Sequence, residues 1–239
     1  MTKLEKIAFP IIFVVVFVAY VISRTMNNDA FSSHWMIRED GFLEWLTVSA
    51  LFFSALVCWF RSWTLSQSSS MLFICCTAMY GVVLFFGMGE EISWGQRIFG
   101  IETPEFLAEA NAQKETNLHN LVIGGTSINR LVFGKILAVG LVGFLILVPV
   151  AYRRSPGMCN LCDRLAIPVP RLQHTLAILA VVLLVETSRA TKRGEITEFA
   201  LTSLVFLLLL NPLNLQVFRK TPKAVKTSSE QPIARRAAA

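Results

Sequence analysis

Apolar runs of membrane length constrain this chain more than any other feature of its sequence. The clearest run, residues 71–88, contains only apolar or small residues, and its length is close to the roughly 20 residues with which a helix crosses a bilayer. Charged residues make up only 16% of the chain, against about a quarter in soluble domains. We therefore predict an all-α integral membrane bundle of about six transmembrane helices. Their expected ranges are 7–23, 40–60, 71–88, 131–152, 172–187 and 195–210.

The bundle is expected to be the only folded domain. Residues 1–218 form it, because no polar block is long enough for a separate soluble domain. Residues 219–239 are basic and rich in Ser, Thr, Ala and Pro, a composition typical of a disordered tail. The first apolar run is interpreted as an uncleaved helix rather than a signal peptide, because no clear small-x-small cleavage site follows it.

The basic residues predict how the bundle sits in the membrane. The net charge is +6, and the surplus lies beside apolar runs, so orientation and contact with membrane lipid explain it better than nucleic-acid binding. If the N-terminus is cytoplasmic, 13 basic residues fall inside and 9 outside. The positive-inside rule thus favours cytoplasmic termini at both ends. The basic tail offers a site for anionic lipid, although a solvated tail is the simpler interpretation.

The acidic residues separate more sharply between the two faces. With this topology, thirteen of the sixteen fall at the outer face. The second helix is predicted to begin with Asp40 as its N-cap, so that Glu44 lies one turn inside, where free backbone N–H groups favour a carboxylate. Helices two, three, five and six all bring carboxylates to this face. The sequence therefore predicts a shared acidic basin at the outer interface.

The polar segment between helices three and four is the most distinctive part of the chain. Glu90 and Glu91 lie at the C-terminal end of helix three, where negative charge is unfavourable. Either this helix continues through Trp94 and Arg97, or a cation, a proton or a hydrogen-bond donor compensates the charge. Further on, Thr103-Pro104-Glu105 is typical of a helix start, with Thr as N-cap. It predicts a short helix lying at the membrane interface.

The candidate site draws on this segment. If residues 111–120 are helical, Glu115 and His119 are neighbours on one face; if they are extended, the odd-numbered polar residues all point one way. Carboxylates with an imidazole suit a divalent metal ion or acid–base catalysis. The candidate catalytic and metal-binding residues are Glu90, Glu91, Glu115 and His119. The candidate substrate-binding and orienting residues are Glu44, Trp94, Gln96, Arg97, Asn117 and Asn120.

Structural interpretations compete with these roles. The acids could simply pair with arginines and lock the outer loop onto the bundle, which spacing alone makes as good an interpretation. Trp94 is more typical of an interfacial anchor than of a sugar or head-group platform. His174, at the opposite face, is expected to be structural. Cys159 and Cys162 supply only half a zinc site in a linking segment expected to be a basic loop.

One long motif resembles a known group of proteins. The pattern runs from Gly89-Glu90-Glu91-Ile92-Ser93-Trp94-Gly95-Gln96-Arg97 through Glu102-Thr103-Pro104-Glu105 to Asn117-Leu118-His119-Asn120. It resembles bacterial multi-pass membrane proteins of unassigned function. The resemblance covers helices two to four and implies a bacterial inner-membrane setting, with no activity attached.

Three function classes follow from these observations. The first is an interfacial hydrolase or transferase that acts on a lipid or lipid-linked substrate. The second is an ion- or proton-coupled transporter or channel, which the apolar middles of helices three, four and six disfavour. The third is a non-catalytic subunit whose outer segment docks a partner and would expose Trp94 and Phe106.

Overall fold

The computed structural model describes residues 1–118, 120–123, 126–127 and 137–219. Helices dominate these residues, and the β-structure within them consists of one antiparallel pairing of two-residue strands and an isolated bridge between Asn111 and Leu121. The elements are α1 (Lys3–Thr25), α2 (Asn28–Ser33), α3 (Phe42–Leu65), α4 (Met71–Glu91), η1 (Ser93–Gly95), α5 (Gln96–Phe99), α6 (Glu105–Ala110), β1 (Val122–Ile123), β2 (Thr126–Ser127), α7 (Leu137–Arg154), α8 (Pro156–Arg164), α9 (Leu172–Glu186), α10 (Arg193–Leu210) and η3 (Leu215–Phe218).

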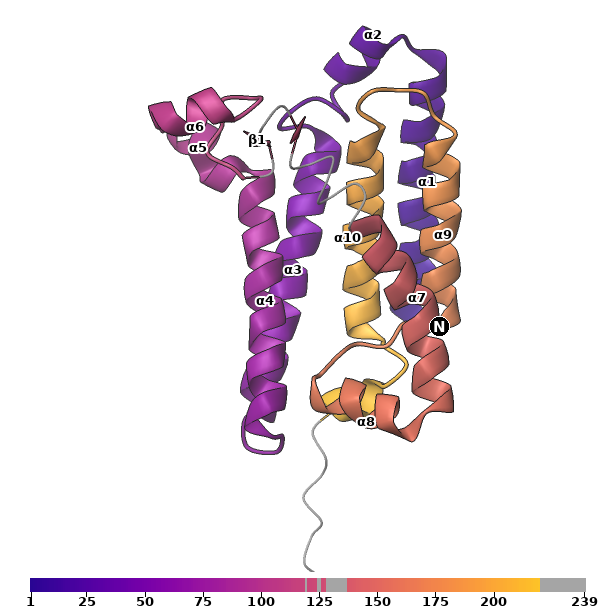
Figure 1. Ribbon diagram of the computed structural model, residues 1–239. Coiled ribbons are helices and arrows are strands. Elements are labelled where there is room, and N and C mark those ends of the chain that lie inside the picture. The colour runs from indigo at the N-terminus through magenta and orange to yellow at the C-terminus, as the bar shows by residue number, and fades with distance from the viewer. Residues whose placement is uncertain (119, 124–125, 128–136, 220–239) are drawn as a thin grey trace, which may run out of the picture.

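The helix α10 lies at the centre of the arrangement. It packs on one side against α3, which forms a long hairpin with α4, and on the other side against α1 and α9 (Figure 1). Val16 of α1, Ile178 of α9 and Leu204 of α10 are fully buried in one apolar core. The described residues from Ile92 to Ile123, which we call the cap, project beyond the end of α4. The helix α8 lies at the opposite end of the bundle.

Three helices of the described residues are long and apolar enough to cross a membrane: α1, α3 and α4. Their outward faces carry large apolar side chains, among them Val14, Phe53 and Val83, each more than half exposed. Contiguous apolar surface of this extent is unfavourable in water and suits a lipid environment. The predicted helical membrane protein is thus supported, whereas α9, at 15 residues, is a shorter apolar helix.

The starts of α3 and α7 differ from the predicted helix starts. Asp40 is not the N-cap of α3, because it adopts a positive φ of 56° and Gly41 takes the capping position. The Asp40 backbone N–H instead donates to Glu44 Oε2 at 2.8 Å. The fourth predicted helix, 131–152, is seen as α7 from Leu137, and residues 131–136 lie outside the described residues. The predicted tail beyond residue 219 also lies outside them.

The linking segment after α7 was wrongly predicted as a loop. It forms α8, which begins at a Ser-Pro start: Ser155 accepts a hydrogen bond from the Met158 N–H at 3.3 Å, and Pro156 occupies the first turn. The helix buries Cys162, and Tyr80 of α4 donates to the Leu165 carbonyl just beyond it at 2.9 Å. The N-terminal cap and the contact with α4 therefore stabilise a helix in this segment, although its composition had predicted a loop.

The close approach of α3 and α4 depends on one glycine. The Trp59 indole N–H donates to the Ala78 carbonyl at 3.3 Å, and its ring lies over Gly81. A Cβ at residue 81 would lie 2.4 Å from Trp59 Nε1, which is far inside contact distance. At Gly87, on the same helix, the nearest heavy atom would be 3.8 Å away.

We expect Gly81→Ala to destabilise the protein relative to Gly87→Ala by about 1–3 kcal/mol, the usual effect of overpacking. Both substitutions gain the same helix propensity, so their difference isolates the clash with Trp59. Thermal unfolding of the purified protein in detergent measures it. Equal melting temperatures for the two variants would contradict the tight helix contact.

Candidate functional site

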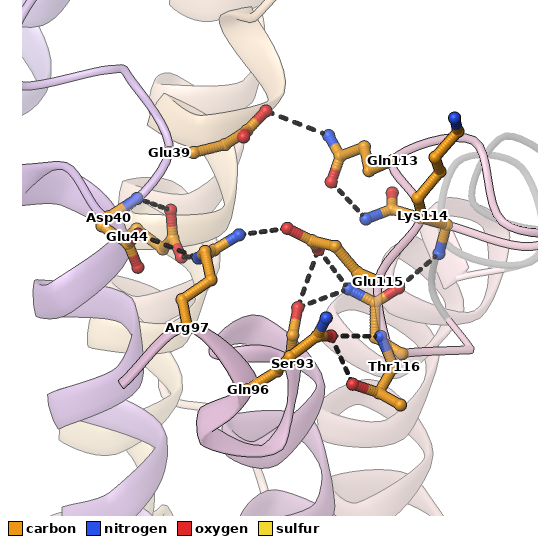
Figure 2. Close-up of polar contacts among 12 residues, drawn as sticks. Glu39, Asp40, Glu44, Ser93, Gln96, Arg97, Gln113, Lys114, Glu115 and Thr116 are labelled. Carbon is orange, nitrogen blue, oxygen red and sulfur yellow. Dashed lines mark hydrogen bonds and ion pairs between the residues drawn. The ribbon is translucent and has the colours of Figure 1, made fainter. Parts of the chain in front are cut away.

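Arg97 joins the cap to the helical bundle. It lies on the short helix α5, just beyond the end of α4, and its guanidinium meets three carboxylates (Figure 2). Nη2 donates to Glu44 Oε1 of α3 at 3.0 Å, and Nη1 donates to Glu115 Oε1. Asp40 Oδ2 lies 2.8 Å from Nε, close enough for an ion pair although the N–H is not aligned with it. One side chain thus connects α3 to both halves of the cap.

The surroundings of Arg97 favour its protonated, positively charged form. Burial alone lowers the pKa of this guanidinium, but the carboxylates of Glu115, Asp40 and Glu44 outweigh burial and raise the pKa above its ordinary value. Arg97 therefore remains a cation at every physiological pH and neutralises the buried carboxylates of Glu44 and Glu115 as well as the exposed one of Asp40.

Glu115 sits at the centre of a buried hydrogen-bond network. Its Oε2 accepts from the Ser93 hydroxyl at 2.7 Å and from the Asn117 amide at 2.9 Å. Its backbone N–H donates to Asn111 Oδ1 at 3.2 Å, and Asn111 in turn donates to Asn117 Oδ1 at 2.9 Å. The residue is 8% exposed. All of its described contacts hold the cap together.

Residues 111–118 are extended and turned rather than helical. Of the two conformations that the sequence allowed, the extended one agrees with the burial of Asn111, Glu115 and Asn117 on one side. Gln113 is exposed at the rim. His119 lies outside the described residues, so its predicted place beside Glu115 stays a prediction.

The negative charge of Glu90, unfavourable at the C-terminal end of α4, is stabilised by two hydrogen-bond donors. The helix α4 ends at Glu91 and does not continue through Trp94, whose φ is +54°. That turn brings the Trp94 indole N–H back to Glu90 Oε1 at 2.8 Å, while the Leu118 backbone N–H donates to Oε2 at 2.7 Å. Trp94 also packs on the Gly89 backbone, where a Cβ would lie 2.7 Å from its ring. Glu90 thus anchors both ends of the cap to α4.

Gln96 holds two segments of the cap together, because its side chain contacts both Thr103 and Thr116. Its amide N–H donates to the Thr103 hydroxyl, and its carbonyl oxygen accepts from the Thr116 backbone N–H at 2.7 Å and from the Thr116 hydroxyl. Thr103 donates onward to the Lys114 carbonyl at 2.6 Å, so it does not cap α6 as predicted, and Pro104 takes that position. Gln96 therefore has a positioning role.

A polar cavity of about 320 Å³ lies where the cap meets α3, α4 and α10. Seven carboxylates and two cationic side chains line it. The lining residues are Glu39, Glu44, Glu90, Glu91, Arg97, Gln113, Glu115, Asn117, Asn120, Thr191, Lys192, Gly194, Glu195 and Glu198. We call this space the cap cavity. It places Glu44, Glu90, Glu91 and Glu115 together, as the predicted acidic basin requires.

Exposed contacts close the rim of the cap cavity. The Gln113 amide donates to Glu39 Oε1 at 3.3 Å (Figure 2). Lys192 Nζ lies 3.4 Å from the same oxygen. Asn120 donates to Gln113 Oε1 at 2.5 Å. These contacts are solvent-accessible, so they hold the rim more weakly than the buried network around Glu115 holds the wall.

The predicted site residues that the structure describes fall into two positions. Arg97, Asn117, Asn120 and the four glutamates line the cap cavity, whereas Trp94 and Gln96 lie in the walls behind it. No group of three or more His, Cys, Asp or Glu side chains suited to a metal ion occurs among the described residues. Both oxygens of Glu90 and of Glu115 accept hydrogen bonds from protein donors, which leaves these two carboxylates poorly suited to act as metal ligands.

Sequence reasoning assigned no site role to the carboxylates that α10 brings to the cavity. Glu195 and Glu198 lie one turn apart at the start of α10, and they face Glu91 at the end of α4 across the cavity. Their spacing of three residues, which places two side chains on one helix face, was the available signal. The packing of α10 against α3 could not be read from the sequence.

Comparisons of this chain with protein-family models, with curated proteins and with solved structures found no match.

Proposed function

We propose that the protein is a bacterial inner-membrane protein in which α7, α9 and α10 cross the bilayer together with α1, α3 and α4. The packing of α10 between the α3–α4 hairpin and α1 supports a crossing by α10, because a helix enclosed by spanning helices shares their depth. The helix α9 packs on α10, and Leu145 of α7 is buried in the same apolar core. The distribution of basic residues supports cytoplasmic termini. The cap and its cavity then face the periplasm.

The cap lies at head-group depth in this proposal. Phe99 and Phe106 are both more than 70% exposed, and Ile98 and Ile101 are more than half exposed. These side chains follow directly on the end of α4, and Phe86 of α4 makes an edge contact with Trp94 at 5.3 Å between ring centroids. Aromatic side chains beside a span are favoured at the interface. The cap helices therefore rest on the outer leaflet.

We propose further that the cap cavity performs acid–base chemistry, as a hydrolase or transferase, on the head group of a lipid or lipid-linked substrate. The observation that carries this proposal is that Glu91 of α4 and Glu195 of α10 line one cavity from two different helices. Glu44, Glu90 and Glu115 are bound by Arg97, Trp94 and Ser93 and build the walls. Glu91, Glu195 and Glu198 line the same cavity from two facing helices.

Facing carboxyl groups can carry out both proton transfers of such a reaction. One removes a proton from water or an acceptor hydroxyl as it attacks, and the other returns a proton to the leaving group. A volume of about 320 Å³ lies at the low end for ligand pockets. It suits a head group whose lipid tail stays in the adjacent bilayer.

Glu91→Gln is expected to abolish lipid turnover while leaving the fold intact, because the amide keeps the shape but cannot transfer the proton. The purified protein is incubated in nanodiscs made from a total bacterial lipid extract, and all lipid species are followed by mass spectrometry. Wild type should consume one lipid class and Glu91→Gln should not.

Glu105→Gln is the matched control, because Glu105 is an exposed acid of α6 outside the cavity. It should behave as wild type. If wild type changes no lipid class, or if Glu91→Gln turns over lipid at the wild-type rate, the proposed acid–base role of the cavity is wrong.

A further inference from the structure

A second cavity opens at the other end of the bundle. Its volume is about 360 Å³, and it lies between α1, α9 and α10. The side chains that line it are Met1, Phe9, Pro10, Ile12, Phe13, Gln173, Ala177, Val181 and Leu204. It shares no residue with the cap cavity. All of its lining residues except Gln173 are apolar, so it favours an apolar occupant.

The cavity lies at the membrane depth of the part of an acyl chain that is nearest to the head group. Phe9 and Phe13 lie six and ten residues into α1, a helix long and apolar enough to span a membrane. At 1.5 Å per residue they lie roughly 9–15 Å from the helix start. A lipid whose phosphate is level with the first turn of α1 would place its ester groups and first methylenes beside these rings.

One residue that lines the cavity carries a hydrogen-bond donor with no acceptor among the described residues. Gln173 Nε2 is buried and makes no hydrogen bond there. A buried donor without an acceptor is unfavourable, and such groups are normally satisfied by protein, water or ligand. The ester carbonyl of a phospholipid is an acceptor at the right depth. Gln173 thus distinguishes this cavity from a merely apolar groove.

The charge around the entrance favours an anionic head group. Lys3 and Lys6 are exposed in the first turns of α1, the helix that forms one wall. The acid between them, Glu5, is 1% exposed and is bound by His174 and Asn211. The two lysines are therefore available to a lipid phosphate.

We infer that this cavity binds an anionic phospholipid. One acyl chain lies along Phe9, Phe13 and Val181, an ester carbonyl accepts from Gln173, and the head group is held by Lys3 and Lys6. The inference stands apart from the proposed activity, because the cavity is at the other end of the bundle.

Photo-crosslinking tests the inference. The full-length protein is placed in nanodiscs that contain phosphatidylglycerol with a diazirine on its acyl chain, and the labelled peptides are identified by mass spectrometry. Wild type should be labelled preferentially around residues 9–13 and 177–181. Ala177→Phe, which fills the cavity, should lose this labelling, whereas Leu176→Phe on the exposed side of the same helix should retain it.

A second variant keeps the test independent of cavity packing. Lys3→Gln with Lys6→Gln alters only exposed side chains and should remove the preference for the phosphatidylglycerol probe over a phosphatidylcholine probe. Labelling spread evenly over all exposed helix faces, or unchanged by Ala177→Phe, would overturn the site. Equal labelling of wild type by both probes would overturn the anionic head group.

Discussion

Arg97→Ala is expected to destabilise the protein by about 2–4 kcal/mol, since removing one partner leaves largely buried carboxylates without a counter-charge. Glu44 and Glu115 are 9% and 8% exposed, and both contact this guanidinium. The loss falls below the value for a fully buried pair because the Arg97 side chain is 27% exposed. Arg97→Lys should recover part of it, because an ammonium group restores the charge but reaches fewer of the three acids.

Arg193→Ala is the matched control for this experiment. Arg193 also forms an ion pair, with Glu186 at 3.3 Å, but the two side chains are 40% and 61% exposed. Exposed pairs contribute only about 0–1 kcal/mol. Thermal unfolding in detergent, followed by tryptophan fluorescence, compares the variants. Equal losses for Arg97→Ala and Arg193→Ala would show that the cap is not held through Arg97.

The convergence of the acids could be predicted from the sequence because each acid lies at the end of an apolar run. Charged groups that flank a span must gather at its ends, and alternating runs bring every second end to the same face. Glu44, Glu91 and Glu195, on three different helices, therefore meet at one cavity. The helical membrane architecture follows from the same run lengths.

The partners of these acids could not be predicted in the same way. Arg97 reaches Glu44 because Ser93 and Trp94 both take positive φ values and Gly95 follows at +79°, which turns the chain sharply after α4. Non-glycine residues rarely adopt that conformation. Its cost is offset by the hydrogen bond of Trp94 to Glu90, four residues away, and by the tertiary hydrogen bond of Ser93 to Glu115. No local pattern encodes such compensation, so the sequence alone left the helix end undecided.

Glu5→Leu is expected to destabilise the protein by about 3–5 kcal/mol, the usual consequence of breaking a fully buried polar pair. The carboxylate of Glu5 joins three distant parts of the chain at the end opposite the cap. It lies 2.9 Å from His174 Nε2 and accepts from the Asn211 amide at 3.0 and 2.9 Å. It also accepts from the Thr2 backbone N–H at 2.6 Å, which completes the capping box of α1. His174 is therefore placed in a structural role.

A double-mutant cycle separates this interaction from simple loss of packing. His174 is 0% exposed and Glu5 is 1% exposed, so neither side chain can turn to water when its partner is removed. Each single replacement by leucine strands the other group. The double variant removes both groups and leaves only the donors of Asn211, Thr2 and Arg171 without their acceptors. Its destabilisation should therefore fall clearly below the sum of the single losses. Glu105→Leu, at an exposed acid, should stay within about 0.5 kcal/mol of wild type. Strictly additive losses would mean that Glu5 and His174 do not stabilise one another, and that α1 is held to α9 and α10 by its apolar face alone.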